Sequence, residues 1–309
     1  MKKNLFITIL AAASLLATAR AAEPAQRNAL RAPAYPLITI DPYTSCWSAG
    51  DYLYDSHTTH WTGQPFPLVG ALRVDGKVYR FMGIDAPTGA FDANFGGERH
   101  FSVPAVQRSA DVQAMQTVYE FVCGPVELTL TFTAPLFLDD LDLISRPVNY
   151  ISYKTRSLDG AAHDAQIYFE ASPACAVNNA EQESVSKSYR KEGLTFVSTG
   201  SKEQKILHRK GDQIKIDWGY FYLCVQNGKA GWRKVKGETF VTAEAALSEG
   251  NALFAFAYDD IDSIEYFKKP LKAYWKRSGK TIEEAIADAF AEYPALCARE
   301  REFSQTLTR

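Results

Sequence analysis

The chain has 309 residues, of which 46% are hydrophobic and 13% aromatic, and its 34 basic and 36 acidic residues give a formal net charge of −2. This length and hydrophobic content allow a large core in one large or two small domains. The slightly acidic balance disfavours a nucleic-acid partner, because proteins that bind nucleic acids present a basic face to the phosphates.

The first 21 residues have the pattern of a secretory signal peptide. Lys2 and Lys3 precede an apolar run from Leu5 to Leu16, and Ala19-Arg20-Ala21 fits a small-x-small cleavage site. We therefore expect cleavage after Ala21 and a secreted or periplasmic protein. Cleavage would remove three basic residues and leave 31 basic and 36 acidic ones, a net charge of −5. No later stretch is apolar for long enough to span a membrane, so we expect no membrane partner.

Residues 22–63 are expected to form an extended N-terminal segment and a long loop. Leu37–Ile40 is a short strand signal that Asp41-Pro42 ends, and the stretch that follows has no clear period. Long irregular segments of compact domains are usually functional or form packed surface loops. This loop contains His60 and Trp61, which are candidates for binding a substrate. The simpler interpretation is that the histidine forms hydrogen bonds within the loop.

Residues 64–280 carry many short strand signals separated by turn residues. Asp75-Gly76 between two apolar runs predicts a hairpin, and residues 126–133 alternate between apolar and polar side chains, as in a half-buried strand. Residues 214–218 and 220–225 are also predicted as strands, broken by Gly219. Strands do not alternate with helices, which favours antiparallel pairing. The predicted fold is mainly β: an antiparallel, supersandwich-like β-sandwich with C-terminal helices.

A charged connection follows the strand at residues 126–133. It contains Asp139, Asp140, Asp142 and Arg146, and a second strand is predicted after Pro147. The simpler interpretation is a polar connection in which Arg146 pairs with a nearby carboxylate. The alternative is a wall of a catalytic site, in which Asp142 and Asp140 act as acid–base groups and Arg146 holds a substrate carboxylate through its bidentate fork. The EF-hand pattern is absent, and we expect neither a metal nor a cofactor.

The end of the chain, residues 281–309, is predicted to be helical. Thr281 and Glu284 form a capping box, and apolar residues follow at helical spacing. Pro294 is expected to end this helix and open a second one, Ala295 to Leu307. We interpret the segment as a helical linker toward a missing helical domain. An interface with such a domain would expose the apolar side chains of Ile286, Phe290, Tyr293, Phe303 and Leu307.

The five cysteines, at positions 46, 123, 175, 224 and 297, are odd in number and show no C-x-x-C spacing. Zinc-binding and thioredoxin-like sites are therefore disfavoured. One or two disulfides are possible in an oxidising compartment. Cys224 lies in an apolar run and is expected to be a small buried residue.

A further set of motifs extends in order over most of residues 33–300. They are Pro36–Tyr43 with Trp47-Ser48, His60–Gly63, Val74–Lys77, Arg80–Gly83, Phe132–Pro147, Asp217–Tyr220, Ala257–Ile261, Ser263–Phe267 and Ala273–Arg277. As an ordered set they resemble the bacterial and fungal glutaminase A family. The resemblance implies a large secreted protein with an N-terminal β-rich region and a C-terminal helical, toroid-like region that hydrolyses L-glutamine to L-glutamate and ammonia.

Members of that family extend well beyond residue 309. The resemblance therefore implies that this chain is a non-catalytic or accessory sandwich that packs on a helical catalytic domain, downstream or in trans, and lines the cleft for a small amide substrate. It leaves open whether the chain is itself an enzyme. The alternative is a carbohydrate-binding or glycoside-hydrolase-associated module. A glycan could then stack on Trp47, Trp61, Trp232 and Trp275, whereas Trp218 is expected in the core.

Overall fold

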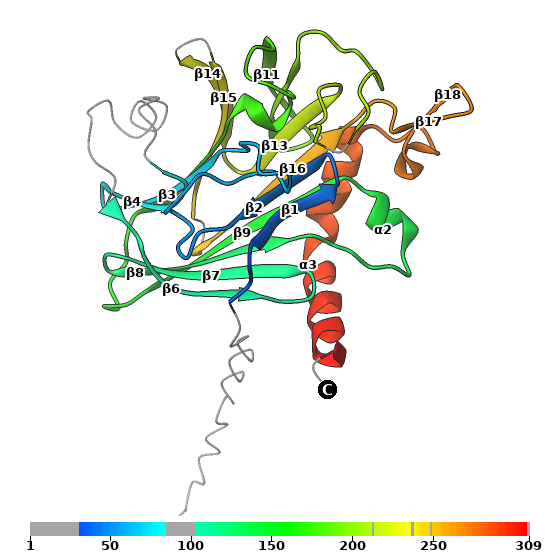
Figure 1. Ribbon diagram of the computed structural model, residues 1–309. Helices are drawn as coiled ribbons and strands as arrows, with labels where there is room; N and C mark the ends of the chain where they lie inside the picture. The colour runs from blue at the N-terminus through cyan, green and yellow to red at the C-terminus, as the bar shows by residue number, and fades with distance from the viewer. Residues whose placement is uncertain (1–30, 85–102, 212, 236–237, 248, 308–309) are drawn as a thin grey trace, which may run out of the picture.

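The computed structural model describes residues 31–84, 103–211, 213–235, 238–247 and 249–307 (Figure 1). The expected signal peptide lies outside these residues. The described chain forms two large sheets packed face to face and one long helix, α3 (Ile282–Leu307). The prediction of a mainly β, antiparallel sandwich is confirmed.

The smaller of the two sheets has six strands. In spatial order they are β14 (Lys229–Val235), β15 (Glu238–Ala246), β10 (Ala165–Ala171), β3 (Leu68–Val74), β4 (Lys77–Met82) and β5 (Val103–Pro104). All neighbours are antiparallel except β4 and β5. The predicted hairpin joins β3 to β4, and its turn residues Asp75 and Gly76 have φ angles of 49° and 83°. Two successive positive φ values match a type I′ turn, which asparagine, aspartate and glycine favour.

The larger sheet has eight antiparallel strands. In spatial order they are β11 (Ser184–Lys191), β12 (Leu194–Ser201), β13 (Tyr220–Gln226), β16 (Asn251–Asp259), β9 (Val148–Ser157), β8 (Val126–Thr133), β7 (Gln116–Cys123) and β6 (Val106–Val112). Two small hairpins lie outside both sheets: β1 (Tyr35–Asp41) with β2 (Thr44–Ser48), and β17 (Ile264–Tyr266) with β18 (Lys269–Leu271). The sequence did not indicate β2, β14 or the second hairpin.

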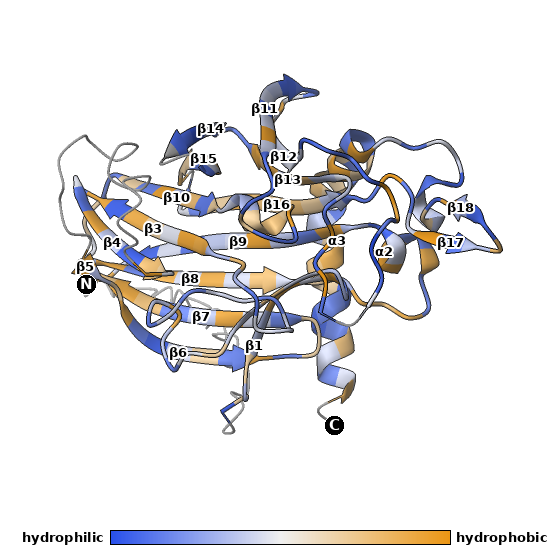
Figure 2. Cartoon of the chain, turned by 45° about the horizontal axis from the view of Figure 1, so that its top comes forward, coloured by the Kyte–Doolittle hydropathy of each residue, from blue (hydrophilic) through white to orange (hydrophobic). Residues whose placement is uncertain are grey.

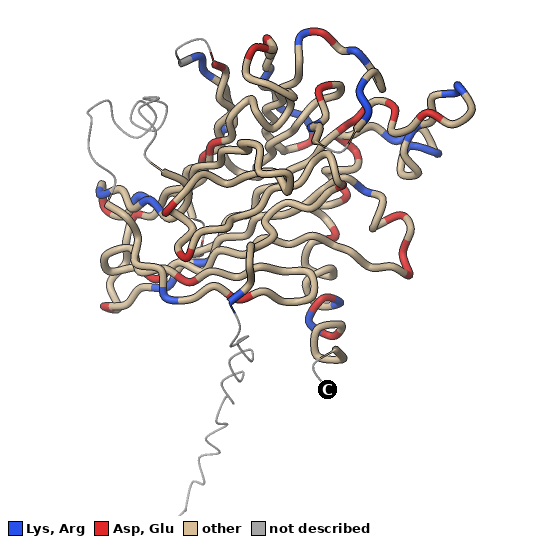
Figure 3. The backbone as a smooth tube through the Cα atoms, viewed as in Figure 1, with Lys and Arg blue, Asp and Glu red and all other residues tan. Residues whose placement is uncertain are grey.

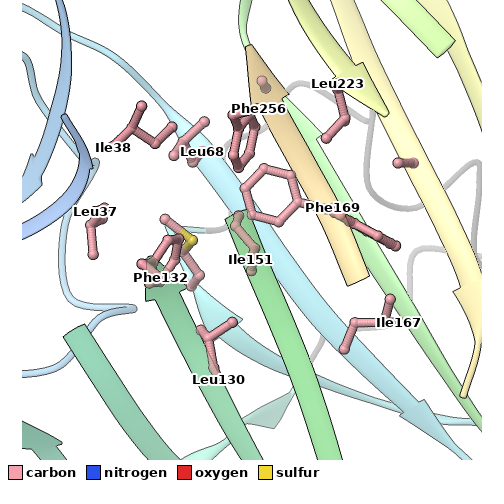
Figure 4. Packing of buried hydrophobic residues seen from close by; sticks show 14 of the residues in the cluster. Leu37, Ile38, Leu68, Leu130, Phe132, Ile151, Ile167, Phe169, Leu223 and Phe256 are labelled. Atoms are coloured by element: carbon pink, nitrogen blue, oxygen red, sulfur yellow. The ribbon is translucent and has the colours of Figure 1, made fainter. Parts of the chain in front are cut away.

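The main core lies between the two sheets. The predicted alternation along β8 is confirmed, because Val126, Leu128, Leu130 and Phe132 are at most 3% exposed while the residues between them face outward. Figure 2 shows the same alternation of hydrophobic and hydrophilic residues along the strands. Phe169 of β10 packs edge-on against Phe256 of β16, with ring centroids 5.1 Å apart (Figure 4). Burying a side chain of this size contributes about 1.5–3 kcal/mol.

A second core lies between the outer face of the eight-stranded sheet and α3. Tyr150, Tyr222 and Ala257 point from the sheet toward Ile286 and Ala289 of the helix. The helix starts at the predicted capping box: Thr281 Oγ1 accepts from the Glu284 N–H, and Glu284 Oε2 accepts from the Thr281 N–H at 2.8 Å. The molecule therefore has three layers, with the eight-stranded sheet in the middle (Figure 1).

One prediction about the C-terminal segment is wrong, and another is confirmed only in part. A single helix continues through Pro294, because Leu296 beyond it is buried on the sheet and the ring of Phe303 packs on Phe137, 5.9 Å away. These contacts compensate for the hydrogen bond that proline cannot donate. The apolar side chains expected at an exposed interface fall into two groups. Ile286 is fully buried, and Phe290 and Tyr293 pack on the second core, whereas Phe303 and Leu307 are 39% and 63% exposed.

Other predictions can be compared directly with the structure. The predicted strand at residues 214–218 is irregular, although Trp218 is 3% exposed in the main core, as expected. All five cysteines are free, so neither possible disulfide forms, and Cys224 is buried as predicted. Among the described residues, no helix combines the length and the hydrophobicity that crossing a membrane requires.

Candidate functional site

Three of the candidate residues, Asp140, Asp142 and Arg146, lie together at one end of the sandwich. They belong to the short helix α2 (Leu141–Ser145) and its two flanking positions, between β8 and β9. Figure 3 shows the acidic stretch leading into α2 at the edge of the molecule. Across from it are α3, between Ala285 and Arg299, and the turn η2 (Tyr274–Lys276). A hollow of about 560 Å³, here called the α2–α3 hollow, separates these elements and is lined by all three residues.

Asp140 caps α2 and also binds α3. Its Oδ1 accepts from the Leu143 N–H at 3.0 Å, and its Oδ2 accepts from Arg299 at 2.8 Å. The other guanidinium nitrogen of Arg299 bonds Asp139 at 2.9 Å. The bond to Arg299, followed by the backbone bond, lowers the pKa of Asp140 below its usual value. This carboxylate is therefore ionised at neutral pH, which argues against a role as a general acid.

Asp142 is exposed and forms an ion pair with Arg277 beyond η2, with 2.5 Å between Oδ1 and NH1. The hydrogen bond from Arg277 lowers the pKa of Asp142. A catalytic acid–base group usually has a pKa moved toward the working pH by burial, whereas here the shift goes the other way. Both aspartates thus anchor the connection through ion pairs with Arg277 and Arg299. The simpler interpretation is correct that the connection is polar, but Arg146 pairs with Glu292 of α3 and not with a nearby carboxylate.

Arg146 is the most buried charged group of the α2–α3 hollow, and its side chain is only 9% exposed. It donates to Glu292 of α3 at 2.7 Å and to the Tyr150 hydroxyl at 3.3 Å. Its Nε has no hydrogen-bond partner in the described part of the chain. The hollow also contains Arg277, Lys280 and Arg299. A small anion that displaced Glu292 would meet a buried guanidinium with donors to spare.

A second hollow of about 310 Å³ lies on the other side of α2. Its walls include Ser145 of α2, Trp218, Asp41 and Asp260, and we call it the Trp218 hollow. Burial, and to a smaller extent the repulsion from Asp260, raises the pKa of Asp41. Burial likewise raises the pKa of Asp260, although Lys276 Nζ lies 3.8 Å away. Both aspartates belong to sequence motifs, but neither was predicted as a site residue.

His60 and Trp61 lie apart from the other three candidates and do not line the α2–α3 hollow. The Pro42 carbonyl oxygen accepts from Trp61 Nε1 at 2.7 Å and from His60 Nε2 at 2.9 Å. His60 Nδ1 lies 2.8 Å from the Thr62 hydroxyl, and burial lowers the pKa of the imidazole. His60 is 1% exposed, so it supports the loop and has no free edge for a substrate.

Trp61 is 53% exposed and forms one wall of a third, shallow hollow of about 450 Å³, here called the Trp61 hollow. The other walls come from the β1–β2 hairpin, and the turn residues Asp41 and Pro42 also border the Trp218 hollow. Within the described residues, no three histidine, cysteine, aspartate or glutamate side chains are grouped so that they could hold a metal ion.

Comparison with known proteins supports the resemblance found in the sequence. Residues 7–87 match a family described as a domain of unknown function (DUF4964), and residues 115–251 match a second one (DUF5127). The chain is 27% identical over 230 residues to glutaminase A of Aspergillus oryzae. That match covers 71% of this chain but 30% of the fungal protein, so the chain spans less than a third of its length. The chain is therefore distantly similar to part of glutaminase A.

Proposed function

We propose that this chain is the accessory, non-catalytic β-sandwich part of a secreted amidohydrolase that converts L-glutamine to L-glutamate and ammonia. In this proposal the sandwich packs on a helical catalytic domain and lines one side of the substrate cleft with its α2 end. The signal-peptide pattern of residues 1–21 supports secretion, and the relation to glutaminase A supports the reaction.

The observation that carries the proposal is the convergence of the sequence motifs on the Trp218 hollow. Every residue lining it except Ile216 belongs to one of the motifs that carry the resemblance. These motifs are separated by as much as three quarters of the chain, yet they supply adjacent walls at one end of the sandwich. Six of the nine motifs thus meet at one hollow, as expected of a surface that handles a substrate or a catalytic partner, whereas Val74–Lys77 and Arg80–Gly83 lie on the β3–β4 hairpin.

The state of the candidate residues supports an accessory role. Amide hydrolysis needs a nucleophile or an activated water and a group that stabilises the oxyanion. Asp140 and Asp142 are held in ion pairs with depressed pKa values, and His60 has both ring nitrogens engaged. Arg146 keeps an unused donor, which suits the binding of a carboxylate. These candidate residues therefore favour recognition of a substrate over its chemical conversion.

The test is a domain exchange measured by ammonia release from L-glutamine. Residues 22–309 of this chain are assayed alone, and they also replace the matched region of the Aspergillus oryzae glutaminase A. We expect no ammonia from the chain alone, release by the exchange protein, and none from the fungal protein lacking that region. Arg146→Ala in the exchange protein is expected to raise KM, with Arg156→Ala, an exposed arginine of β9, as the control.

Activity of the chain alone that Asp142→Asn or Arg146→Ala abolishes would place the chemistry in this chain and contradict the accessory role. Full activity of the fungal protein without the matched region would contradict a contribution to the cleft.

A second candidate function is a carbohydrate-binding module. It is favoured by one observation, that Trp47 and Trp61 border the same hollow. The other tryptophans do not extend this surface: Trp275 is 5% exposed, and Trp232 lies 48% exposed on β14.

A further inference from the structure

The ion pair between Arg146 and Glu292 joins a buried cation to an exposed anion. The side chain of Arg146 is 9% exposed, whereas that of Glu292 on α3 is 58% exposed. Arg146 is also held from the interior by the Tyr150 hydroxyl, to which it donates at 3.3 Å. Within the described chain, Glu292 has no other hydrogen-bond or salt-bridge partner. Its carboxylate can therefore turn into solvent by a change of side-chain rotamer, while the guanidinium stays in place.

The contact with Glu292 uses only part of what the guanidinium can offer. Glu292 accepts through Oε2 alone, from Nη1 of Arg146 at 2.7 Å. A guanidinium can instead hold a carboxylate through two parallel hydrogen bonds, which are stronger than one. A buried guanidinium also needs an anion beside it, because an interior charge without a partner is strongly destabilising. Arg146 therefore requires a carboxylate, but the carboxylate of a ligand serves as well as that of Glu292.

The other three cations of the α2–α3 hollow lie nearer the solvent and have partners of their own. Arg277 pairs with Asp142, Lys280 with Asp288, and Arg299 with Asp139 and Asp140. These three basic side chains are 44%, 40% and 37% exposed, so each attracts an anion only weakly. The attraction is greatest at Arg146, and a hollow of about 560 Å³ has room there for a molecule the size of an amino acid.

We propose that Glu292 occupies, in the free protein, the place at which Arg146 binds the carboxylate of a small ligand, and that the ligand binds by displacing it. Glu292 is then a built-in competitor of the ligand. The exchange leaves Arg146 beside an anion throughout and returns the Glu292 carboxylate to water. The apparent affinity for the ligand is reduced to the extent that Glu292 holds the place. No covalent bond is made or broken.

The choice of an amino acid as the ligand rests on the proposed function, but the test measures binding and not ammonia release. Residues 22–309 are titrated with L-glutamine by calorimetry at constant ionic strength. Glu292→Gln keeps the size of the side chain and removes the competing charge, so it should tighten the binding about fivefold or more. Glu302→Gln, a change at an exposed glutamate of α3 away from the hollow, should leave the affinity unchanged.

Two further titrations identify the groups that meet in the complex. L-Glutamine amide lacks the α-carboxylate and should not bind to Glu292→Gln. Arg146→Lys keeps the positive charge but loses the bidentate fork, so it should weaken the binding of L-glutamine when combined with Glu292→Gln.

Thermal denaturation separates this role from that of a purely structural ion pair. Glu292→Gln should lower the melting temperature, because Arg146 loses its anion, and added L-glutamine should restore it where an equal concentration of sodium chloride does not. Restoration by sodium acetate as well would support the carboxylate site and show that it accepts any small carboxylate.

The proposal is overturned if L-glutamine binds to none of the variants. It is also overturned if Glu292→Gln lowers the melting temperature without tightening the binding, since Glu292 would then be only a structural partner of Arg146. If the binding results are as expected but the exchange protein releases no ammonia, the proposed function fails and the displacement of Glu292 stands.

Discussion

Arg299 of α3 donates to Asp140, the residue that caps α2, across 159 positions of sequence, with 2.8 Å between the two atoms. The same guanidinium stacks on Phe137, with its carbon 4.0 Å from the ring centroid. One side chain of the helix thus holds the connection that contains the predicted catalytic aspartates. The β8–β9 connection therefore attaches α3 to the sandwich through Arg299.

Asp140 makes two separable interactions: it caps α2 by accepting from the Leu143 N–H, and it forms an ion pair with Arg299. Asparagine keeps the acceptor that caps α2, whereas alanine removes it. We expect Asp140→Ala to lower the free energy of unfolding by about 1–2 kcal/mol, and Asp140→Asn to lower it by about 0–1 kcal/mol, because only the partly exposed ion pair is lost. Urea denaturation of both variants and of Arg299→Ala measures this, and equal losses for the two aspartate variants would contradict the capping role.

Local patterns predicted local structure well. The alternation along Val126–Thr133, the turn at Asp75-Gly76 and the capping box at Thr281 all describe interactions between residues close in sequence. The apolar pattern of residues 214–218 predicted a strand, but the segment is irregular and is held by long-range contacts. Lys215 Nζ donates to the Pro65 and Ala174 carbonyls, each at 2.9 Å, and these partners lie 150 and 41 positions away.

In the α2–α3 hollow, too, the sequence predicted neighbours within one segment but not contacts between distant segments. Asp140, Asp142 and Arg146 were predicted together and lie together, since one short segment carries them. Their partners Arg277, Glu292 and Arg299 were missed, because ion pairs between segments more than 130 positions apart leave no local signal. His60 and Trp61 were predicted as substrate contacts together with Arg146, but the fold places their loop against the β1–β2 turn, where both donate to the Pro42 carbonyl.

Glu170 of β10 gives the protein a pH-dependent stability. It is 3% exposed, and burial raises its pKa to about 7 even though the Tyr168 hydroxyl donates to it at 2.6 Å. The folded-state pKa thus lies above the ordinary value of 4.5. Between these values the unfolded chain releases a proton that the folded chain retains, so this group's contribution to stability falls as the pH rises from about 4.5 to 7.

Glu170→Gln removes this titration and keeps an acceptor for Tyr168. Relative to the parent protein, the variant should be unchanged near pH 4 and more stable at pH 8, by up to about 3 kcal/mol. Thermal or urea denaturation at both pH values tests this. Glu183→Gln, a change at an exposed glutamate, should show no such difference. A gain for Glu170→Gln that is the same at pH 4 and pH 8 would show that the carboxyl does not titrate between them.

His163 lies between two carboxylates, which favour its charged form, whereas the burial of Glu170 disfavours the charged form of that residue. Its ring nitrogens lie 2.6 Å from Asp75 and 2.9 Å from Asp159, and these bonds raise the pKa of the imidazole while lowering that of Asp159 to about 2. The stabilisation is fully present below the ordinary histidine pKa of 6.5 and is lost as the pH rises through the raised value. His163→Gln should therefore lower the melting temperature at pH 5.5 and have little effect at pH 9, and an equal loss at both would refute the ionic contribution.

Cys297 is the one cysteine that is partly exposed, and the other four are buried. Burial raises the pKa of Cys46 and of Cys123 to about 12, which leaves almost no thiolate at neutral pH. Burial raises the pKa of Cys297 as well, so its accessibility is what distinguishes it from the other four. We expect an aromatic disulfide reagent to modify this one thiol slowly in the native protein at pH 8, and all five in guanidinium. Cys297→Ser should abolish the native reaction and leave four thiols after unfolding. Rapid modification of a second thiol in the native protein would mean that one of the sheets opens to the reagent, which the buried positions in both cores contradict.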